Sequence, residues 1–302
     1  MHARVVVVDG DAYYSRPGQR LADSLVGRSN ECTYPPEVVH LPVVTAARID
    51  PAALESVEID RQVREAIKDG RSLYAVDAEL IERLAPDVIV TQDLCAVCAV
   101  SSGELGSACP VGATVISLDP STLDEVATSI ETLARALGVP ERGSELAGEM
   151  RRSIDEIRRA TAGLPRPRVF VAEWIDPPFV PGHWLPDMID AAGREALLAE
   201  PGRPSHPTTW DEVTAADPEL VVIAPCGFDV DEAVRRSAHL DFARIAPNAR
   251  VVVVDGDAYY SRPRPRLADG VHQLGHLLHP GAVTKDPRLP MVELQREPIS
   301  VP

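Results

Sequence analysis

The chain has 302 residues, of which 45% are hydrophobic and 25% charged, so it can bury one large core or two ordinary ones and is not a disordered chain. Its net charge of −16 excludes a nucleic-acid partner, because such a chain repels a phosphate backbone and no basic cluster offsets that repulsion. No apolar run approaches the ~18 residues of a membrane-spanning helix, so we expect a protein that does not span a membrane.

Short β-branched apolar runs recur along the chain and predict strands that are buried on both faces. They lie at Val5–Val8, Val88–Thr91, Thr114–Ser117, Val169–Ala172, Leu220–Ala224 and Val251–Val254. Helix-like segments lie between many of them, at Ile59–Asp69, Asp77–Leu84 and Leu123–Leu137. This alternation of strands and helices predicts an α/β fold with parallel sheets.

A longer helical segment runs from about Glu141 to Ala162. One apolar stripe follows its helical period, at steps of four, four and three residues: Leu146, Met150, Ile154 and Ile157. We interpret this helix as a rigid strut between two lobes, with a peripheral helix of one continuous domain as the alternative. The predicted domains are an N-terminal α/β lobe over residues 1–140, a linker helix over 141–162 and a C-terminal α/β lobe over 163–302.

One segment, ARVVVVDGDAYYSRP, occurs twice, at Ala3–Pro17 and at Ala249–Pro263. Structural repeats diverge in sequence, so identity at one place only does not indicate a solenoid. It indicates a recent duplication, a recombined gene or an engineered chimera. A strand–turn–helix segment of this kind is compatible with the edge or the centre of either sheet.

Ligands of open α/β sheets bind outside the carboxyl ends of the strands, so the loops that follow the predicted strands hold the candidate site. The candidate ligand-binding residues are Gln92, Asp93, Glu173, Trp174, Phe179, His183, Trp184, Phe228, Tyr259, Tyr260 and Arg262. Trp174, Phe179 and Trp184 follow neither a helix nor a strand period. They predict an aromatic wall for a large apolar or macrocyclic ligand, with packing of this loop against the second lobe as the alternative.

Two further groups of polar side chains belong to these loops. His183 and His206 are candidate contacts to a metal, although a lone histidine is more often a surface or capping residue. Arg262 and Arg266, with the neighbouring tyrosines, are candidates for hydrogen bonds to an anionic or amide-bearing ligand, and surface ion pairing is the alternative. Nucleotide-binding loops and the common hydrolase motifs are absent from the sequence.

The five cysteines are odd in number, which does not suit a complete disulfide framework and favours reduced thiols. Cys95 and Cys98 are spaced as a redox pair, half of a metal site or two packed thiols. Together with Cys32 and Cys226 they are candidate metal ligands, although four-thiolate zinc sites usually show two close pairs. The start of the sequence lacks an apolar core of ~7–15 residues, so we expect a cytoplasmic protein.

Five loop motifs occur in order along the chain. They are GRSNECTYPPEV, IDRQVREAIKDGRSLYAVDAELIERLAPDVIVTQDLCAVCAVS, VAEWIDPPFVPGHWLPDMIDAAG, APCGFD and VVVVDGDAYYSRPRPRLADG. This series, from about Gly27 to His279, resembles the cobalamin-binding-protein-like branch of the ABC transporter substrate-binding proteins. These belong to the helical-backbone metal receptors, which have the class III periplasmic-binding fold.

The resemblance implies an α/β fold of two Rossmann-like lobes with parallel sheets, joined by a single long helix. It implies a non-enzymatic solute-binding protein that captures a corrinoid (cobalamin-like) or related metal chelate in the cleft between its lobes. Such a protein needs no cofactor, is expected to be a monomer, and docks on an ABC permease in its closed form. The chain departs from the family pattern at Asp9–Ser15, which stands in place of a Pro-Ser-Ala-Thr-Glu-type loop.

Two other hypotheses stay open. The first is a cytoplasmic thiol-based metal-binding or redox protein that uses Cys32, Cys95, Cys98 and Cys226. The second is an enzyme that acts on a corrinoid or another metal complex. The enzyme ranks last, because the sequence shows no general base or nucleophile with a partner.

Overall fold

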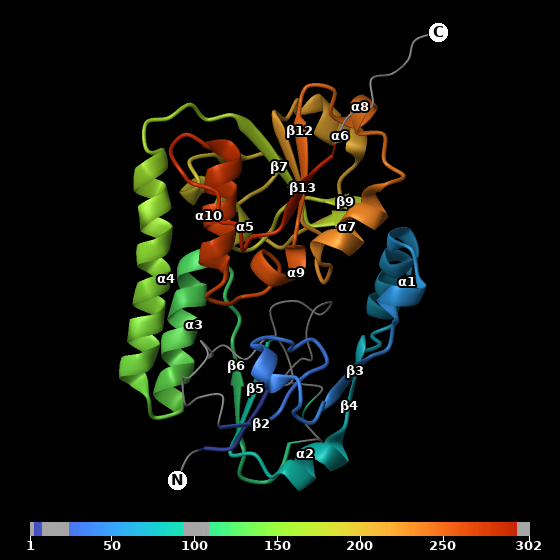
Figure 1. The fold of residues 1–302 in the computed structure, drawn as a ribbon. Helices are drawn as coiled ribbons and strands as arrows, with labels where there is room; N and C mark the ends of the chain where they lie inside the picture. The colour runs from blue at the N-terminus through green and yellow to red at the C-terminus, as the bar shows by residue number, and fades with distance from the viewer. Residues whose placement is uncertain (1–2, 8–23, 93–104, 106–108, 295–302) are drawn as a thin grey trace. The chain divides into compact units, whose positions relative to one another are not determined.

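The computed structural model describes residues 3–7, 24–92, 105 and 109–294, and the account below concerns those residues. The chain divides into two compact units. Unit 1 comprises Met1–Pro120 and Glu125–Ala147, and unit 2 comprises Ser121–Asp124 and Gly148–Pro302. The main β-sheet of each unit is built largely from the continuous apolar runs of the sequence (Figure 1).

Unit 1 contains a four-stranded parallel sheet in the order β2-β1-β5-β6. Its strands are β1 (Val5–Val7), β2 (Leu25–Gly27), β5 (Val88–Thr91) and β6 (Thr114–Ser117). Two further strands, β3 (Thr45–Ala47) and β4 (Tyr74–Val76), form an antiparallel pair. In the sequence α1 (Ser56–Lys68) connects β3 to β4, and α2 (Ala78–Leu84) follows β4. Val6, Ile81 and Ile89 have no exposed surface and form the core of this unit.

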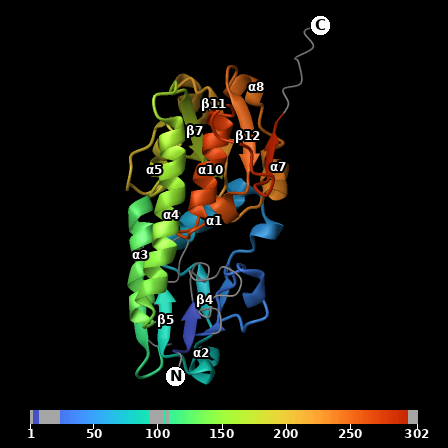
Figure 2. The ribbon, with the colours of Figure 1, turned by 60° about the vertical axis from the view of Figure 1, so that its left-hand side comes forward.

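Helix α3 (Leu123–Ala136) and the part of α4 (Pro140–Thr161) that belongs to unit 1, up to Ala147, lie side by side in both views (Figures 1 and 2). Their bounds confirm the two helices predicted from the sequence. The predicted stripe of α4 is buried, from 3% exposed at Met150 to 7% at Ile157. The division between the two units falls inside α4, after Ala147.

Unit 2 contains a five-stranded sheet in the order β10-β7-β11-β12-β13. Its strands are β7 (Arg168–Ala172), β10 (Glu195–Ala196), β11 (Leu220–Ile223), β12 (Arg250–Val254) and β13 (Met291–Glu293). The first four are parallel, whereas β13 runs antiparallel to β12. Every residue of β11 is buried, as expected for a strand that is covered on both faces.

Helices cover both faces of this sheet. They are α5 (Leu185–Ala191), α6 (Trp210–Ala215), α7 (Val230–Ser237), α8 (Phe242–Ile245), α9 (Gly256–Tyr259) and α10 (Leu267–Leu278). Figures 1 and 2 show α5 and α10 along one face and α7 and α8 along the other, and Figure 1 shows α6 beside α8. On the second face Trp210 packs edge-on against Phe170 and Phe242, with ring centroids 6.2 and 5.8 Å away. The predicted α/β fold with parallel sheets is therefore confirmed.

Within the described parts of the chain, none of the helices combines the length and the apolar character needed to cross a membrane.

Candidate functional site

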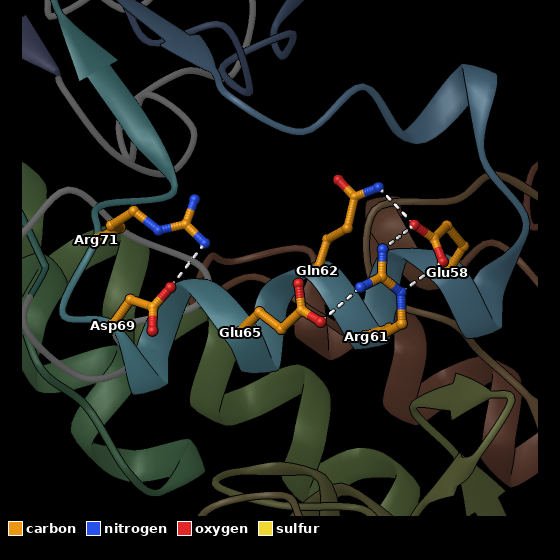
Figure 3. Close-up of polar contacts among 6 residues, drawn as sticks. All are labelled: Glu58, Arg61, Gln62, Glu65, Asp69 and Arg71. Atoms are coloured by element: carbon orange, nitrogen blue, oxygen red, sulfur yellow. Dashed lines mark hydrogen bonds and ion pairs between the residues drawn. The ribbon is translucent and has the colours of Figure 1, made fainter.

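A hollow of about 520 Å³ lies in unit 1, beside α1. Its polar lining comes from Arg48, Arg61, Gln62, Glu65, Arg71 and Ser72. Figure 3 shows Arg61 between two carboxylates, 2.5 Å from Glu58 and 2.5 Å from Glu65, while Arg71 lies 3.1 Å from Asp69. The hydrogen bonds from Arg61 lower the pKa of Glu58 to about 2. Two of the three arginines that line this hollow, Arg61 and Arg71, are therefore paired with carboxylates of α1 and of the residue that follows it.

The loops at the carboxyl edge of the unit 2 sheet are joined by backbone hydrogen bonds. The N–H of Cys226, after β11, donates to the carbonyl of Glu173, after β7, at 2.9 Å. The N–H of Asp257, after β12, donates to the carbonyl of Phe228 at 3.2 Å. Three loops that are distant in the sequence therefore form one surface, at the edge where α/β sheets bind their ligands.

A two-stranded ribbon rises from this edge, formed by β8 (Trp174–Ile175) and β9 (Pro178–Phe179). Trp174 is paired with Phe179, and Ile175 with Pro178. Ile175 has no exposed surface and belongs to the core of unit 2. Because successive side chains of a strand point to opposite faces, Trp174 and Phe179 lie together on the face that points away from this core, where both are half-buried.

Phe228 extends this aromatic pair. Its ring lies 5.5 Å from that of Trp174, with 30° between the ring planes, and the residue is 7% exposed. We call Trp174, Phe179 and Phe228 the aromatic platform. Arg236 of α7 also packs on Phe228, and its guanidinium carbon is 4.2 Å from the centroid of the Phe228 ring. The sequence reasoning missed Arg236, and the available signal was its spacing of four residues from Glu232 on one helix.

A polar group from the segment after β12 belongs to the same edge. Arg262 Nη2 lies 2.6 Å from Asp257 Oδ1, and the two side chains are 13% and 24% exposed. The guanidinium of Arg266 lies over the ring of Tyr259, 4.4 Å from its centroid. Burial raises the pKa of Asp255, which caps the N-terminus of α9. This group supplies hydrogen-bonding side chains, and its two cations, Arg262 and Arg266, contact a carboxylate and an aromatic ring respectively.

Three other predicted residues lie deeper in unit 2. Trp184 is 4% exposed and its indole N–H donates to the carbonyl of Tyr260 at 2.8 Å. Tyr260 has no exposed surface, and its hydroxyl donates to Gln273 at 2.8 Å. His183 is half-buried with a positive φ of 50°, and burial lowers its pKa, so its imidazole is neutral at neutral pH. Trp184 and Tyr260 therefore present little or no surface to a ligand, whereas His206 is exposed.

The remaining candidates are divided between the units or lie outside the described residues. Gln92 follows β5 in unit 1 and is 7% exposed, and Cys32 is buried in the same unit. Cys226 is half-buried in unit 2. Asp93, Cys95 and Cys98 lie outside the described residues. Across the rest of the chain, as far as the structure describes it, His, Cys, Asp and Glu form no group of three suited to a metal ion, so the thiolate site stays a prediction.

Comparisons with known proteins agree with this architecture. The model of a family described as periplasmic binding protein matches residues 21–256. The vitamin B12-binding protein of Vibrio cholerae serotype O1 (strain ATCC 39315 / El Tor Inaba N16961) is 22% identical over 262 residues, which is 84% of this chain and 81% of that protein.

Solved structures align over almost the whole chain. The periplasmic vitamin B12-binding protein of Vibrio cholerae aligns with a TM-score of 0.66 at 21% identity, over 94% of this chain and 99% of that one. A periplasmic heme-binding protein from Pseudomonas aeruginosa aligns with a TM-score of 0.69 at 20% identity, over 99% of this chain and 100% of that one. At these identities the two structures establish the fold.

These matches correct one prediction. The expected cytoplasmic location is wrong, because the matching family is one of periplasmic binding proteins and both solved neighbours are periplasmic. The prediction came from the first residues of the sequence and from the odd number of cysteines. Neither feature outweighs a family match over most of the chain.

Proposed function

Since this chain belongs to the periplasmic binding protein family, we propose that it captures a corrinoid, a cobalamin-like metal chelate, at the carboxyl edge of the unit 2 sheet. Its role is solute binding for a metal-chelate ligand, and it is not an enzyme. The chelate is cargo rather than a resident cofactor.

The observation that carries this proposal is the aromatic platform. Trp174 and Phe179 share the face of the ribbon that points away from the core, and Phe228 packs beside Trp174. A flat macrocycle gains about 25 cal/mol for each Å² of apolar surface that it buries on such a platform, before the costs of ordering. Aromatic rings also favour offset stacking, which suits a planar conjugated ligand.

The charges beside the platform favour a corrinoid over an anionic chelate. Arg236 is paired with Glu232 and Arg262 with Asp257, each at 2.6 Å. A ligand with free carboxylates would compete with these ion pairs for the guanidinium groups. The amide side chains of a corrin ring are neutral, and they need hydrogen-bonding groups rather than an unpaired cation.

The test is calorimetric titration with cobalamin, cobinamide, haemin and a ferric siderophore, followed by visible spectra of each mixture. We expect cobalamin or cobinamide to bind at micromolar protein, and more tightly than haemin or the siderophore. If haemin is the one compound of the four that binds, the corrinoid assignment is wrong and the ligand is another metal chelate. Binding of none of the four would overturn the proposal.

The platform is tested by replacing Trp174. We expect Trp174→Ala to weaken corrinoid binding by about tenfold, which corresponds to about 1.4 kcal/mol of stacking and apolar burial. Trp174→Phe keeps an aromatic ring and is the matched control, which we expect to retain most of the affinity. Equal affinities of Trp174→Ala and the wild type would show that the ligand binds elsewhere.

Several finer points stay proposals. They are the domain boundaries at residues 140 and 163, action as a monomer, and delivery to an ABC permease. The expected position of the ligand between the two lobes also stays a prediction.

A further inference from the structure

A buried cation lies at the base of the aromatic platform. The side chain of Arg236 has no exposed surface, and its guanidinium carbon lies 4.2 Å from the centroid of the Phe228 ring. Trp174 also lies beside Phe228, with 5.5 Å between the two ring centroids. Phe228 therefore contacts both the buried guanidinium of Arg236 and the half-buried indole of Trp174.

Burying a guanidinium is costly unless the fold compensates its charge. Here the compensation comes from Glu232, one helical turn earlier on α7, whose carboxylate accepts from Arg236 Nε at 2.6 Å. The same carboxylate accepts from Arg235, and these hydrogen bonds lower the pKa of Glu232 to about 2. The carboxylate is therefore ionised at any physiological pH, and it faces the cation of Arg236 throughout.

The neighbouring arginine shows that the ion pair alone does not explain the burial of Arg236. Arg235 pairs with Glu232 at the same distance of 2.6 Å, yet its side chain is 52% exposed. A surface ion pair would have served α7 equally well. Arg236 also lies over the ring of Phe228, where a desolvated cation attracts the electron-rich face of an aromatic ring.

We propose that Arg236 is a positioning residue for the ligand-binding platform: its cation fixes the ring of Phe228, and Phe228 in turn fixes the angle of the Trp174 indole. Arg236 acts through these two rings and does not touch the ligand. A pre-set indole loses less side-chain freedom when a flat ligand stacks on it, so the affinity rises without any further contact. The part of this inference that concerns affinity rests on the proposed function, whereas the part that concerns Trp174 does not.

The experiment uses the full chain with 5-fluorotryptophan in place of its three tryptophans, Trp174, Trp184 and Trp210. Loss of one fluorine resonance in Trp174→Phe assigns the signal of Trp174. In Arg236→Met we expect that signal to shift or broaden while the other two stay in place. The matched control is Arg235→Met, which removes the exposed partner of the same carboxylate and is expected to leave all three signals unchanged.

Ligand affinity is the second readout. We expect Arg236→Met to weaken cobalamin binding by about tenfold, the effect of losing one desolvated cation–π contact. Arg236→Lys keeps the cation and is expected to recover part of this loss, whereas Arg235→Met binds as the wild type does. If the wild type binds no corrinoid, the proposed function fails, and the fluorine comparison decides the positioning role by itself.

Two results would overturn the inference. One is an unchanged Trp174 signal in Arg236→Met. The other is an equal change of all three signals and of the melting temperature in Arg236→Met and Arg236→Lys, which indicates a general structural role. If Arg236→Met does not fold, Phe228→Leu removes the intervening ring and keeps the ion pair, and a Trp174 signal unaltered by that change overturns the inference as well.

Discussion

Trp174 and Ile175 are adjacent in the sequence but have opposite environments. Ile175 has no exposed surface, whereas Trp174 is half-buried beside Phe228. The alternation of side chains along a strand separates the two, so one step along the chain leads from the core to the candidate ligand surface. A shift of one residue in the pairing of this ribbon would bury the tryptophan and expose the isoleucine.

His279 is a second residue whose environment determines its behaviour. It lies directly after α10 and is 8% exposed, with its Nδ1 3.4 Å from a guanidinium nitrogen of Arg194. Burial and the positive charge of Arg194 lower the pKa of His279 below its ordinary value of 6.5. The folded protein therefore holds the neutral imidazole, while the unfolded chain takes up a proton more readily as the pH falls.

This gives a pH prediction. The stability that His279 contributes is complete above its ordinary pKa and is lost progressively as the pH falls below it. We expect the melting temperature of the wild type to fall more steeply between about pH 7.5 and 5.5 than that of His279→Gln, which cannot take up the proton. Identical pH slopes for the two proteins would contradict this role.

The segment that occurs twice in the sequence forms a β-strand in each unit, with different neighbouring strands. Its first copy contains β1 and its second contains β12. Strand β1 has parallel neighbours on both sides, β2 and β5, whereas β12 has the parallel β11 on one side and the antiparallel β13 on the other. The valine run therefore determines that a buried strand forms, and the remaining chain determines its partners.

Helix α9 begins where two loops approach closely, at Gly256. A Cβ at this position would lie 2.4 Å from the carbonyl oxygen of Pro225 and 2.6 Å from the carbonyl carbon of Ala224. Both are backbone atoms at the end of β11, so neither can rotate away. We expect Gly256→Ala to lower the free energy of unfolding by about 2 kcal/mol or more, because the start of α9 must separate from the loop after β11, which carries Phe228.

The matched control for this change is Gly148→Ala in α4. A Cβ there meets the flexible end of Arg152 at 3.3 Å, and alanine favours a helix over glycine. We expect this variant to gain about 0.5–1 kcal/mol. Guanidinium unfolding of both variants measures the difference, and a Gly256→Ala protein as stable as Gly148→Ala would contradict the close approach.

At the scale of the whole molecule, charge is the dominant feature. A net charge of −16 on 302 residues destabilises the folded chain through self-repulsion, and salt screens that repulsion. The described arginines beside the platform are paired with carboxylates or stacked on aromatic rings. Stability and ligand affinity should therefore respond differently to salt.

We expect the melting temperature to rise as NaCl increases from about 20 to about 200 mM, over which range the Debye length falls to less than half. The affinity for cobinamide should change little over the same range, because apolar burial and neutral amide contacts are not screened. Titration calorimetry and thermal melting in parallel measure the two. A melting temperature that falls with salt would contradict the first expectation, and a strong loss of cobinamide affinity the second.

Long apolar features of the chain predicted its architecture. The strand at Val88–Thr91 and the helix over Pro140–Thr161 were predicted to within a few residues, because a continuous apolar run or a helical stripe has few other ways to be buried. The strand at Thr114–Ser117 was also predicted, but its expected burial on both faces is wrong, because it pairs only with β5 and its side chains are exposed or half-buried. Trp174 and Phe179 could also be singled out, because large aromatic side chains in a proline-rich loop match no regular period.

Contacts between distant segments decided the rest. The two-residue strands β8 and β9 are too short to show a period, so the pairing of Trp174 with Phe179 follows only from the folded ribbon. Trp184 and Tyr260 are large aromatic residues like Trp174, but they are buried, and their polar atoms form hydrogen bonds with partners elsewhere in unit 2. The place of Arg236 behind Phe228 likewise depends on how α7 packs, since hydrophobic burial selects which faces turn inward but not which side chains meet.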